Sequence, residues 1–596
     1  TGIVDEKGIR FESYAYDSND RGISTEMAGG VEKYTLAYTA NQTTVTDPRG
    51  LVKNYNLSTV SGSPYVSALA RNGVTSASNT YDAAANLTER VEFGRKTTYT
   101  YDLSRNLETS RTEAVGTAQE RTISTEWHAT LPVPTKITEP GRLTEFSYDA
   151  NGNALTRTVT DTGVTPTVSR TWTYTYNSAG QMLTETTPAN ETTTYTYDTA
   201  NGNLLTMTNA LNQAITYSNY TADGLPGQIK LVNGRTFNFI YDAAGRVQTQ
   251  TEVLASPSLS DPNGGAGFFR WPQWLVNLIN GWCQALGISS PFTGGTDTPS
   301  TMTYPALTWA TGSAVTSYGY DAVGQLTSVT LPDGDTMTYS YDDAHRLVSM
   351  QDSLGNIISY TLNDAGDVTA TNSSDPNGVL ARKVQQVYNN LGLLTDVIGN
   401  NSQKTSYSYD DLDNLTQRKD ILNRAYSSSY DALNRKISDT DPANGVIGYT
   451  YNALDQLLTV NDARNNTTAY TPNAFGETVQ EQSPDTGTTT RTYNNGRLMQ
   501  VVDARNITHE YIYDGLGRIN TRKDGATATS YAYGSANYGK GLLANAANGQ
   551  GYLAYDYNSA GQVVENITAI RSKQPFRTRY SYTKGGKLRQ IATPTG

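Results

Sequence analysis

The sequence contains few of the residues on which metal sites and nucleophilic catalysis depend. Its 596 residues include one cysteine and three histidines. One cysteine cannot form an intrachain disulfide and leaves no material for a cysteine-rich metal site. Three scattered histidines are poor ligands for a zinc centre. No metal and no cofactor are therefore expected.

Charge and long apolar runs are also scarce. Charged residues make up 17% of the chain, and 45 Lys and Arg stand against 56 Asp and Glu, which gives a net charge of −11. Without a polybasic stretch, an acidic chain is not expected to bind nucleic acid. No run of 18 apolar residues occurs, so no transmembrane helix is predicted.

Tyrosine is abundant, with 42 residues against 10 Phe and 6 Trp. It recurs as Tyr-Asp or Tyr-Asn, often at steps of 20 or 21 residues, and such a fixed period indicates a repeat architecture. The tyrosines of this register include Tyr81, Tyr101, Tyr148, Tyr176, Tyr197, Tyr241, Tyr320, Tyr341, Tyr388, Tyr409, Tyr430, Tyr451, Tyr493, Tyr513 and Tyr557.

The rest of the repeat predicts a β-hairpin. Gly is frequent four residues after the Tyr, and an aliphatic residue is frequent six residues after it. Asp at the start of a turn bonds its own backbone, and Gly or Asn tolerates the left-handed conformation that closes a short hairpin loop. A second turn signal falls midway, as in Asp462-Ala-Arg-Asn465. The Thr-, Tyr- and Val-rich runs between turns favour strands, so each repeat is expected to add one antiparallel hairpin beside the last.

The number of repeats then predicts the architecture. Roughly 25 repeats give on the order of 50 strands, whereas open sheets seldom exceed about ten strands before strand twist makes them curl. The expected fold is all-β: a long antiparallel hairpin-repeat sheet that spirals, wide enough to leave a hollow.

Three units carry a family resemblance: Tyr241-Asp-Ala-Ala-Gly-Arg-Val247, Tyr320-Asp-Ala-Val-Gly-Gln-Leu326 and Tyr513-Asp-Gly-Leu-Gly-Arg-Ile519. They resemble the YD repeats of the Rhs family, which includes bacterial polymorphic toxins, the C component of insecticidal Tc complexes and the teneurins. The resemblance implies a hollow cocoon around a polypeptide cargo, usually a toxin, in a secreted or cell-surface protein, with a partner protein possible at the ends of the shell. It implies a structural role for Tyr241, Asp242, Gly245, Tyr320, Asp321, Gly324, Tyr513, Asp514 and Gly517.

The toxin-releasing core of that family is not found. Toxin-bearing members end their shell with Asp-Pro-x-Gly and a further Gly- and Asn/Tyr-rich segment, where an Asp-dependent self-cleavage occurs. Asp-Pro-x-Gly occurs here at Asp47, Asp261 and Asp375 without the rest of that core. No self-cleavage residue is therefore predicted, and we expect either part of a larger protein or a shell that carries no toxin.

One segment interrupts the repeats. We predict an irregular YD-like segment over 1–80, YD repeats over 81–253 and 313–596, and a non-repeat insertion over 254–312. Within the insertion, apolar residues at helical spacing predict an amphipathic helix near 272–286. Trp271, Trp274, Leu278 and Trp282 are candidates for a plug of the shell or a contact with a partner.

The remaining chemistry favours structure over catalysis. Nearly all the Asp residues occupy turn positions, and His345 replaces a turn Gly. Cross-strand ring pairing explains the Tyr ladder more simply than sugar stacking does. No constellation of catalytic residues appears, so the chain is not expected to be an enzyme. The leading hypothesis is a shell that encloses a polypeptide, and the alternative is a surface or adhesion module that binds glycans or partner cells.

Overall fold

A computed structural model describes residues 1–257, 306–571, 573 and 575–593. Its regular structure is 49 β-strands and three 3-10 turns, η1 (Ala28–Gly30), η2 (Asn400–Ser402) and η3 (Asn537–Gly539). No helix of the described ranges is long and apolar enough to cross a membrane. The predicted helix near 272–286 lies outside the described residues.

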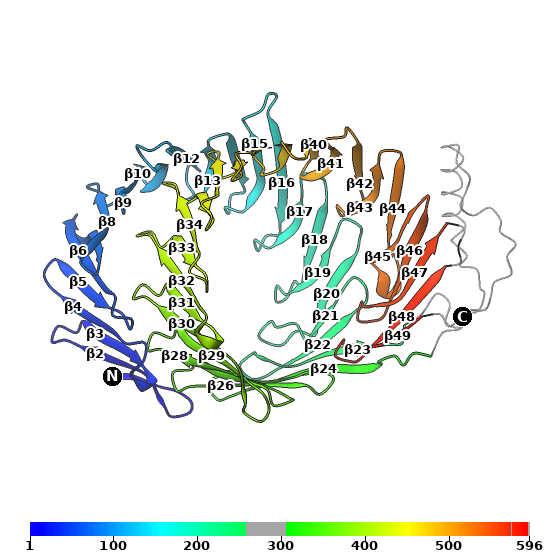
Figure 1. Ribbon diagram of the computed structural model, residues 1–596, viewed down its shortest axis with the longest axis horizontal. Coiled ribbons are helices and arrows are strands. Elements are labelled where there is room, and N and C mark those ends of the chain that lie inside the picture. Colours follow the sequence, from blue (N-terminus) through cyan, green and yellow to red (C-terminus); the bar gives the residue numbers. More distant parts are fainter. Residues whose placement is uncertain (258–305, 572, 574, 594–596) are drawn as a thin grey trace. The chain divides into compact units, whose positions relative to one another are not determined.

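The chain divides into two compact units. Unit 1 holds residues 1–180, 319–329 and 336–490, and unit 2 holds residues 181–318, 330–335 and 491–596. Each unit therefore contains two passes of the repeat sheet that are far apart in the sequence. Figure 1 draws the first pass of unit 1 in blue and cyan and its second pass in green to yellow.

The first pass of unit 1 contains β1 (Gly2–Val4), β2 (Arg10–Tyr16), β3 (Gly22–Met27), β4 (Tyr34–Tyr38), β5 (Gln42–Thr46), β6 (Val52–Val60), β7 (Ser63–Arg71), β8 (Val74–Tyr81), β9 (Leu87–Glu92), β10 (Arg95–Asp102), β11 (Leu107–Glu113), β12 (Arg121–Trp127), β13 (Pro134–Glu139), β14 (Arg142–Tyr148), β15 (Ala154–Asp161) and β16 (Val168–Tyr176). Its second pass contains β25 (Leu326–Thr330), β26 (Thr336–Tyr341), β27 (Leu347–Asp352), β28 (Ile357–Leu362), β29 (Val368–Ser374), β30 (Leu380–Tyr388), β31 (Leu394–Ile398), β32 (Lys404–Tyr409), β33 (Leu415–Lys419), β34 (Ala425–Tyr430), β35 (Lys436–Thr440), β36 (Val446–Tyr451), β37 (Leu457–Asn461), β38 (Thr467–Pro472), β39 (Thr478–Ser483) and the start of β40 (Gly487–Asn494).

The first pass of unit 2 contains β17 (Met182–Thr186), β18 (Thr192–Tyr197), β19 (Leu204–Thr208), β20 (Ala214–Ser218), β21 (Gln228–Lys230), β22 (Thr236–Tyr241), β23 (Val247–Leu254) and most of β24 (Gly312–Tyr320). Its second pass contains β41 (Arg497–Val502), β42 (Thr508–Tyr513), β43 (Ile519–Asp524), β44 (Thr527–Tyr533), β45 (Leu543–Asn548), β46 (Gly551–Tyr557), β47 (Val563–Ile570), β48 (Phe576–Tyr582) and β49 (Leu588–Ala592).

The strands pair antiparallel with their neighbours in sequence, as the hairpin repeat predicts. Tyr409 at the end of β32 pairs with Leu415 at the start of β33, and Tyr430 and Tyr451 make the same pairing with the strands that follow them. A β-bulge stands at each of these tyrosines, where the register shifts by one residue. The all-β hairpin-repeat fold is confirmed, and the ladder includes β1–β8 in the first eighty residues.

The two faces of the sheet differ. The second-last residue of many strands before a Tyr-Asp turn is exposed, while the tyrosines on either side of it are half-buried, as in Tyr339-Ser340-Tyr341. On the exposed face, hydroxyl groups pair across strands, for example Thr450 with Thr459 at 2.7 Å and Ser429 with Ser438 at 2.6 Å. A Tyr-bearing face and a polar face therefore alternate along these strands.

The sheet is a single layer without a thick core. The accessible surface is 32,769 Å², whereas a compact protein of 64.7 kDa is expected to expose roughly 20,000 Å². The fully buried apolar residues are few and mostly alanine, such as Ala77 and Ala592. Stability must therefore come mainly from the hydrogen-bonded ladder, the turns and the contacts between passes.

Candidate functional site: the turns and the seam

The Tyr-Asp turn is built around the Asp carboxylate. Asp242 follows β22, and its Oδ1 accepts hydrogen bonds from the backbone N–H groups of Ala244 and Arg246, both at 2.9 Å. Its Oδ2 accepts a bond from Arg246 Nε at 2.6 Å. The backbone bond from Arg246 outweighs the opposing effect of desolvation, so the pKa of Asp242 is lowered. Both oxygens of the Asp242 carboxylate thus accept hydrogen bonds from residues of its own turn.

Asp321 and Asp514 occupy the same place after Tyr320 and Tyr513. Asp321 Oδ1 accepts bonds from Val323 N–H and Gln325 N–H at 3.1 and 2.8 Å. Asp514 Oδ1 accepts bonds from Leu516 N–H and Arg518 N–H at 2.9 and 3.0 Å. These contacts agree with the structural role that the sequence predicts for both residues.

The fourth turn position has a left-handed backbone. Gly245 has φ = 77° and Gly517 has φ = 72°, a region that costs an L-residue about 1–2 kcal/mol. His345 takes the position at φ = 63°, as expected for a histidine that replaces a turn Gly. Its Nε2 lies 3.0 Å from Asp5 Oδ2, and its ring stacks on Phe11 at 4.1 Å.

The register Tyr links each repeat to the one before it. Tyr409 donates its hydroxyl to the carbonyl of Leu394 at 2.8 Å, Tyr430 to Leu415 at 2.9 Å and Tyr451 to Lys436 at 2.8 Å. Tyr241 and Tyr513 bond the carbonyls of Pro226 and Leu498 in the same way. Burial raises the pKa of Tyr241 and of Tyr513, so the hydroxyl remains a donor at neutral pH.

This hydroxyl bond was not predicted from the sequence, which suggested ring pairing instead. Ring pairs do occur, such as Tyr65 with Tyr81 at a centroid distance of 5.2 Å, but the bond to the carbonyl is the contact that recurs. The sequence does contain a pattern that indicates this bond. The acceptor carbonyl belongs to the residue six positions after the previous register Tyr, so in a 21-residue repeat the donor Tyr always follows its acceptor by 15 residues.

We expect the variant Tyr409→Phe/Tyr430→Phe/Tyr451→Phe to lower the local stability of β32–β37 by about 3 kcal/mol, because each lost bond to a half-buried carbonyl costs about 1 kcal/mol. Hydrogen exchange of these strands measures the change. Tyr407→Phe is the control, because the Tyr407 hydroxyl has no bond to any described residue, and its effect should stay below about 0.5 kcal/mol. Equal effects of control and triple variant would contradict the linking role.

Consecutive turns are joined along one edge of the sheet. Arg346 Nη1 donates to the carbonyl of Asn363 at 3.0 Å, and Arg435 Nη1 donates to the carbonyl of Asn452 at 2.8 Å. The residue after the left-handed position therefore bonds both its own Asp and the next turn. A continuous row of Tyr-Asp turns results.

In unit 1, the Tyr-Asp turns of the second pass contact the opposite, return turns of the first pass. We call this contact the seam. Arg49 donates two hydrogen bonds to Asp367, from Nε to Oδ2 at 2.8 Å and from Nη2 to Oδ1 at 2.6 Å. Further cations of the first pass pair with acids of the second in the same direction: Lys7 with Asp321, Arg71 with Asp413, Arg121 with Asp455 and Arg170 with Glu477.

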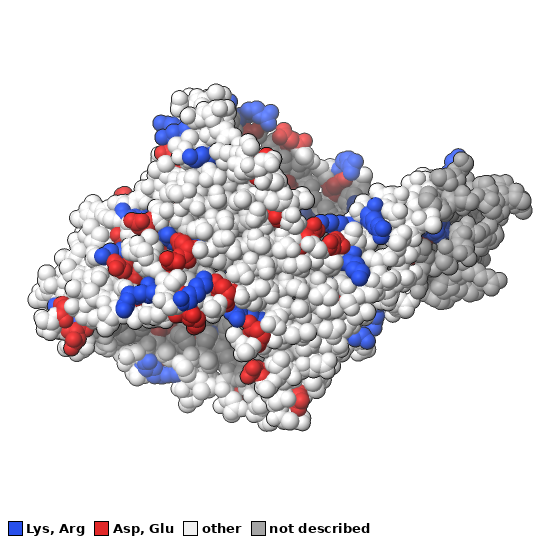
Figure 2. Space-filling model, turned by 90° about the horizontal axis from the view of Figure 1, so that it is seen from below, with Lys and Arg blue, Asp and Glu red and all other residues white. Residues whose placement is uncertain are grey.

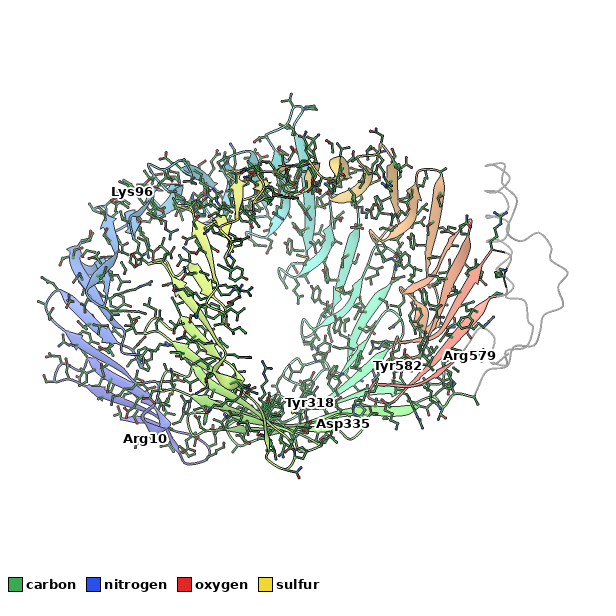
Figure 3. All side chains as sticks on the ribbon, viewed as in Figure 1. Arg10, Lys96, Tyr318, Asp335, Arg579 and Tyr582 are labelled. Atoms are coloured by element: carbon green, nitrogen blue, oxygen red, sulfur yellow. The ribbon has the colours of Figure 1, made fainter. Side chains whose placement is uncertain are left out.

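In unit 2, the seam ion pairs have the opposite polarity. Glu191 of the first pass pairs with Arg497 of the second, and Asp335 pairs with Lys587. Asp335 is labelled in Figure 3 on the turn before β26. On the face that Figure 2 shows, basic and acidic side chains lie in mixed groups, as expected where charges are used for pairing.

Seam carboxylates are held in their charged form. The bond from Arg49 lowers the pKa of Asp367. Burial, the largest single effect, opposes ionisation of Asp321, but the attraction and bond from Lys7 together with the backbone bonds from Gln325 and Val323 outweigh it, and the pKa is again lowered. A lowered pKa gives stability that is complete above the unfolded value, about 3.9 for Asp, and is lost as the pH falls through the folded value.

The seam is therefore expected to persist at pH 5 and to weaken only below about pH 4. Small-angle X-ray scattering between pH 7 and pH 2.5 measures this, because separation of the passes increases the radius of gyration. An Asp367→Asn variant should show a smaller acid-induced change, since it removes one titrating group. Expansion between pH 6 and pH 5 would contradict the assignment.

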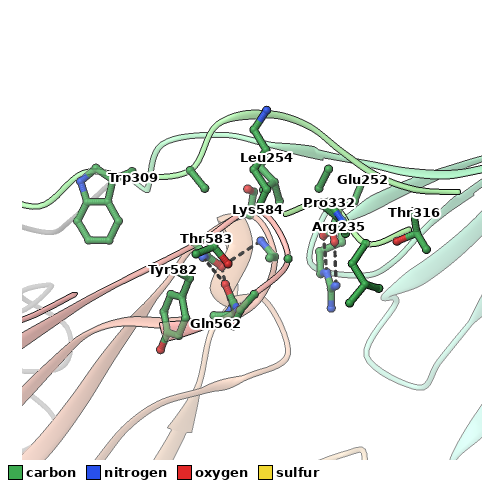
Figure 4. A pocket seen from close by; sticks show the side chains of 18 of the residues that line it. Arg235, Glu252, Leu254, Trp309, Thr316, Pro332, Gln562, Tyr582, Thr583 and Lys584 are labelled. Carbon is green, nitrogen blue, oxygen red and sulfur yellow. Dashed lines mark hydrogen bonds and ion pairs between the residues drawn. The ribbon is translucent and has the colours of Figure 1, made fainter. Parts of the chain in front are cut away.

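One cavity of about 300 Å³ lies within unit 2, between its two passes. Figure 4 shows Arg235, Glu252, Trp309, Gln562 and Lys584 on its wall. Arg235 Nε donates a hydrogen bond to Glu252 Oε1 at 2.8 Å, so these two charged side chains of the cavity wall pair with each other. The lining provides an ion pair and amides but no nucleophile with an adjacent base.

No group of three potential metal ligands occurs in the described ranges. His509 lies 2.6 Å from Asp524 and 3.6 Å from Asp503, two carboxylates that Arg522 and Arg505 also bind. The candidates Trp271, Trp274, Leu278 and Trp282 lie outside the described residues and stay a prediction.

Residues 176–214, 310–336, 320–357 and 388–425 match the profile of the RHS Repeat family. No curated protein sequence matches the chain.

Among solved structures, a Tc holotoxin pore of Photorhabdus luminescens is 15% identical, covers 96% of this chain and 28% of its own, and has a TM-score of 0.47. A TcdB2–TccC3 structure without its hypervariable C-terminal region is 15% identical, covers 95% of this chain and 28% of its own, and has a TM-score of 0.45. The chain thus spans less than a third of the length of either.

Proposed function

We propose that this chain, parts of which match the RHS Repeat profile, forms the wall of a shell that encloses and protects a polypeptide cargo, such as a toxin or effector domain. The single-layer sheet carries the proposal. Its accessible surface of 32,769 Å² is far above the area of a compact protein of this mass. A wall needs two accessible faces, one toward cargo and one toward solvent.

The seam supports the same role. An enclosing wall must not leave open edges between its passes, because unpaired edges admit other chains and water. Here rows of turns close on each other through ion pairs such as Arg49–Asp367 and Arg170–Glu477. The Asp and Tyr residues that recur are used in turns and links between repeats, and the wall itself performs no chemistry.

The cargo would be the principal partner, with a second protein possible at the ends of the shell. We place such a shell outside the cell or at its surface, as the family resemblance implies. The alternative, a surface module that binds glycans or partner cells, needs exposed side chains on the outer face but no enclosed volume.

Neutron scattering with contrast variation separates these functions. The full chain is joined after Gly596 to a deuterated, unstructured polypeptide, and the distance between the centres of mass of the two parts is measured. A shell gives nearly coincident centres and protects the polypeptide from added protease. A surface module gives separated centres and a polypeptide that is cleaved at the rate of the free segment, which would overturn the proposal.

A further inference from the structure

Four strand arginines occupy one recurring place on the Tyr-bearing face of the sheet. Each lies directly across the ladder from the aromatic residue two positions before a register Tyr: Arg111 opposite Tyr99, Arg157 opposite Phe146, Arg418 opposite Tyr407 and Arg522 opposite Tyr511. Side chains directly opposite on one face are close enough to interact. The four places therefore allow a matched comparison of the anions that these arginines bind.

Two of the four arginines are neutralised within their own strand. Arg111 Nε donates to Glu113 Oε1 at 3.0 Å, and Arg522 Nε donates to Asp524 Oδ1 at 2.9 Å. In both strands the acid stands two residues after the Arg, and strand alternation places it on the same face. At these two places the chain itself supplies the carboxylate that the Arg binds.

Arg157 has no such acid. Val159 stands two residues after it, and no carboxylate of the described ranges pairs with Arg157. Arg157 is exposed, and its guanidinium lies over the ring of Trp172, 5.0 Å from the ring centroid. Phe146 and Trp172 flank it on the two neighbouring strands. We call these three residues the Arg157 site.

Arg418 is the second case. Asp420 stands two residues after it, but its Oδ1 accepts bonds from two backbone N–H groups of its own turn, and its Oδ2 accepts a bond from Arg424 Nε at 2.7 Å. Within the part of the chain that the structure describes, no carboxylate pairs with Arg418. Its guanidinium lies 4.2 Å from the centroid of the Tyr426 ring, with Tyr407 on the other neighbouring strand. We call Tyr407, Arg418 and Tyr426 the Arg418 site.

A guanidinium that is stacked on an aromatic ring keeps its N–H edge available for a planar anion. Stacking orients the group, and its donors match the two oxygens of a carboxylate. Arg, Trp and Tyr are also the residues that dominate binding energy at protein interfaces. Two separate guanidinium groups on a chain with a net charge of −11 do not suit a nucleic acid or another polyanion. Isolated carboxylates fit the two sites better.

We propose that the Arg157 site and the Arg418 site bind Asp or Glu side chains of an extended polypeptide, with an apolar side chain beside each acid packed against the rings. The inference rests on the proposed function in taking the enclosed cargo as that polypeptide. The two sites are then contact points that hold the cargo against the wall of unit 1, and they make the wall selective for segments in which acidic and apolar residues are neighbours.

The first measurement uses the full chain with isotope-labelled arginine and the free peptide acetyl-Ser-Glu-Phe-Ser-Glu-Phe-Ser-amide. We expect titration to shift the Nε–H resonances of Arg157 and Arg418, with an affinity on the order of millimolar. The resonances of Arg111 and Arg522 should stay in place, because these side chains already bind acids. A peptide with Gln in place of Glu should need an at least severalfold higher concentration for the same shift.

A variant at Leu155 tests the missing acid directly. Leu155 lies two residues before Arg157 on the same face and is 37% exposed. Leu155→Glu therefore supplies a carboxylate within the strand, and it should reduce the response of Arg157 to the peptide severalfold while Arg418 responds as before. Leu155→Gln is the matched control and should keep the response. Equal responses of the two variants would overturn the inference.

A tethered form separates this inference from the proposed function. The Glu- and Phe-containing sequence is placed in the polypeptide joined after Gly596 for the scattering experiment, and its Gln counterpart is the control. Coincident centres of mass with unmoved Arg157 and Arg418 resonances would leave the shell in place and overturn the inference. Separated centres would overturn the shell, and the free peptide would then decide on the two sites by itself.

Three further outcomes concern the ligand. Shifts with the tethered sequence but not with the free peptide support the inference, because enclosed sites are then reached only from within. Equal shifts with inorganic phosphate would show a general anion site and overturn the assignment to a polypeptide. Shifts of the same resonances on concentrating the chain alone would identify a second copy as the occupant and overturn it too.

Discussion

Glu565→Gln is expected to unfold the last strands of unit 2. Glu565 on β47 has no exposed surface, and its carboxylate accepts bonds from Arg577 Nη1 at 3.0 Å and Arg579 Nε at 2.8 Å. Figure 3 places Arg579 on the neighbouring strand β48. Glu565→Gln removes the buried negative charge that both guanidinium groups bind, at a cost of about 3–5 kcal/mol.

Hydrogen exchange of β46–β48 measures this effect, which corresponds to a loss of protection of about a hundredfold or more. Glu510→Gln is the matched control. Glu510 pairs with Lys523 at 2.8 Å, but both side chains are about two-fifths exposed, so its change should cost less than about 1 kcal/mol.

A second variant separates charge from packing. Replacing all three residues, Glu565→Leu with Arg577→Met and Arg579→Met, removes the buried charges together and should restore much of the protection. If Glu565→Gln had no greater effect than Glu510→Gln, the buried ion pairs would not stabilise these strands.

Arg49→Ala should loosen the seam of unit 1. The bidentate pair with Asp367 is three-quarters buried on the Arg side and more on the Asp side, and bonds between charged groups of this kind contribute about 1.5–3 kcal/mol. We expect about a tenfold or greater loss of hydrogen-exchange protection in the turn 363–367, with β32–β34 unchanged, because stability in repeat sheets is largely local.

Arg424→Ala provides the comparison for the seam. Arg424 bonds Asp420 within the return turn 420–424 and is more than half exposed, so its loss should leave protection in both passes almost unchanged. In a double-mutant cycle, Asp367→Asn should add little to Arg49→Ala. Fully additive effects would show that the two side chains act independently.

The local parts of this fold were predictable from the sequence because each depends on residues within one repeat. Asp242 and Gly245 specify a turn by their own backbone chemistry, and Tyr-x-Tyr on one face follows from strand alternation. The fold class, the hairpin unit and the approximate strand number were confirmed for the same reason.

The seam could not be predicted in this way. Arg49 and Asp367 are 318 residues apart, and a 21-residue period does not reveal how many hairpins complete one pass. Asp47-Pro-Arg-Gly50 was not assigned to a cleavage core, and its sequence predicts only a turn; the structure adds that the Arg of this turn binds Asp367 of the other pass. The hydroxyl bond of Tyr409 was missed because ring pairing explained the same spacing.

The order of the ion pairs along the seam of unit 1 has a consequence for assembly. If the second pass of unit 1 slipped by one hairpin, Arg49 would meet the turn that ends in Leu393 or the one that ends in Arg346, and Arg71 would meet the turn that ends in Arg435. For Arg49 and Arg71, such a slip exchanges attraction for neutrality or repulsion. The order of charges along the chain thus favours one alignment of the two passes of unit 1, which identical repeats alone cannot specify.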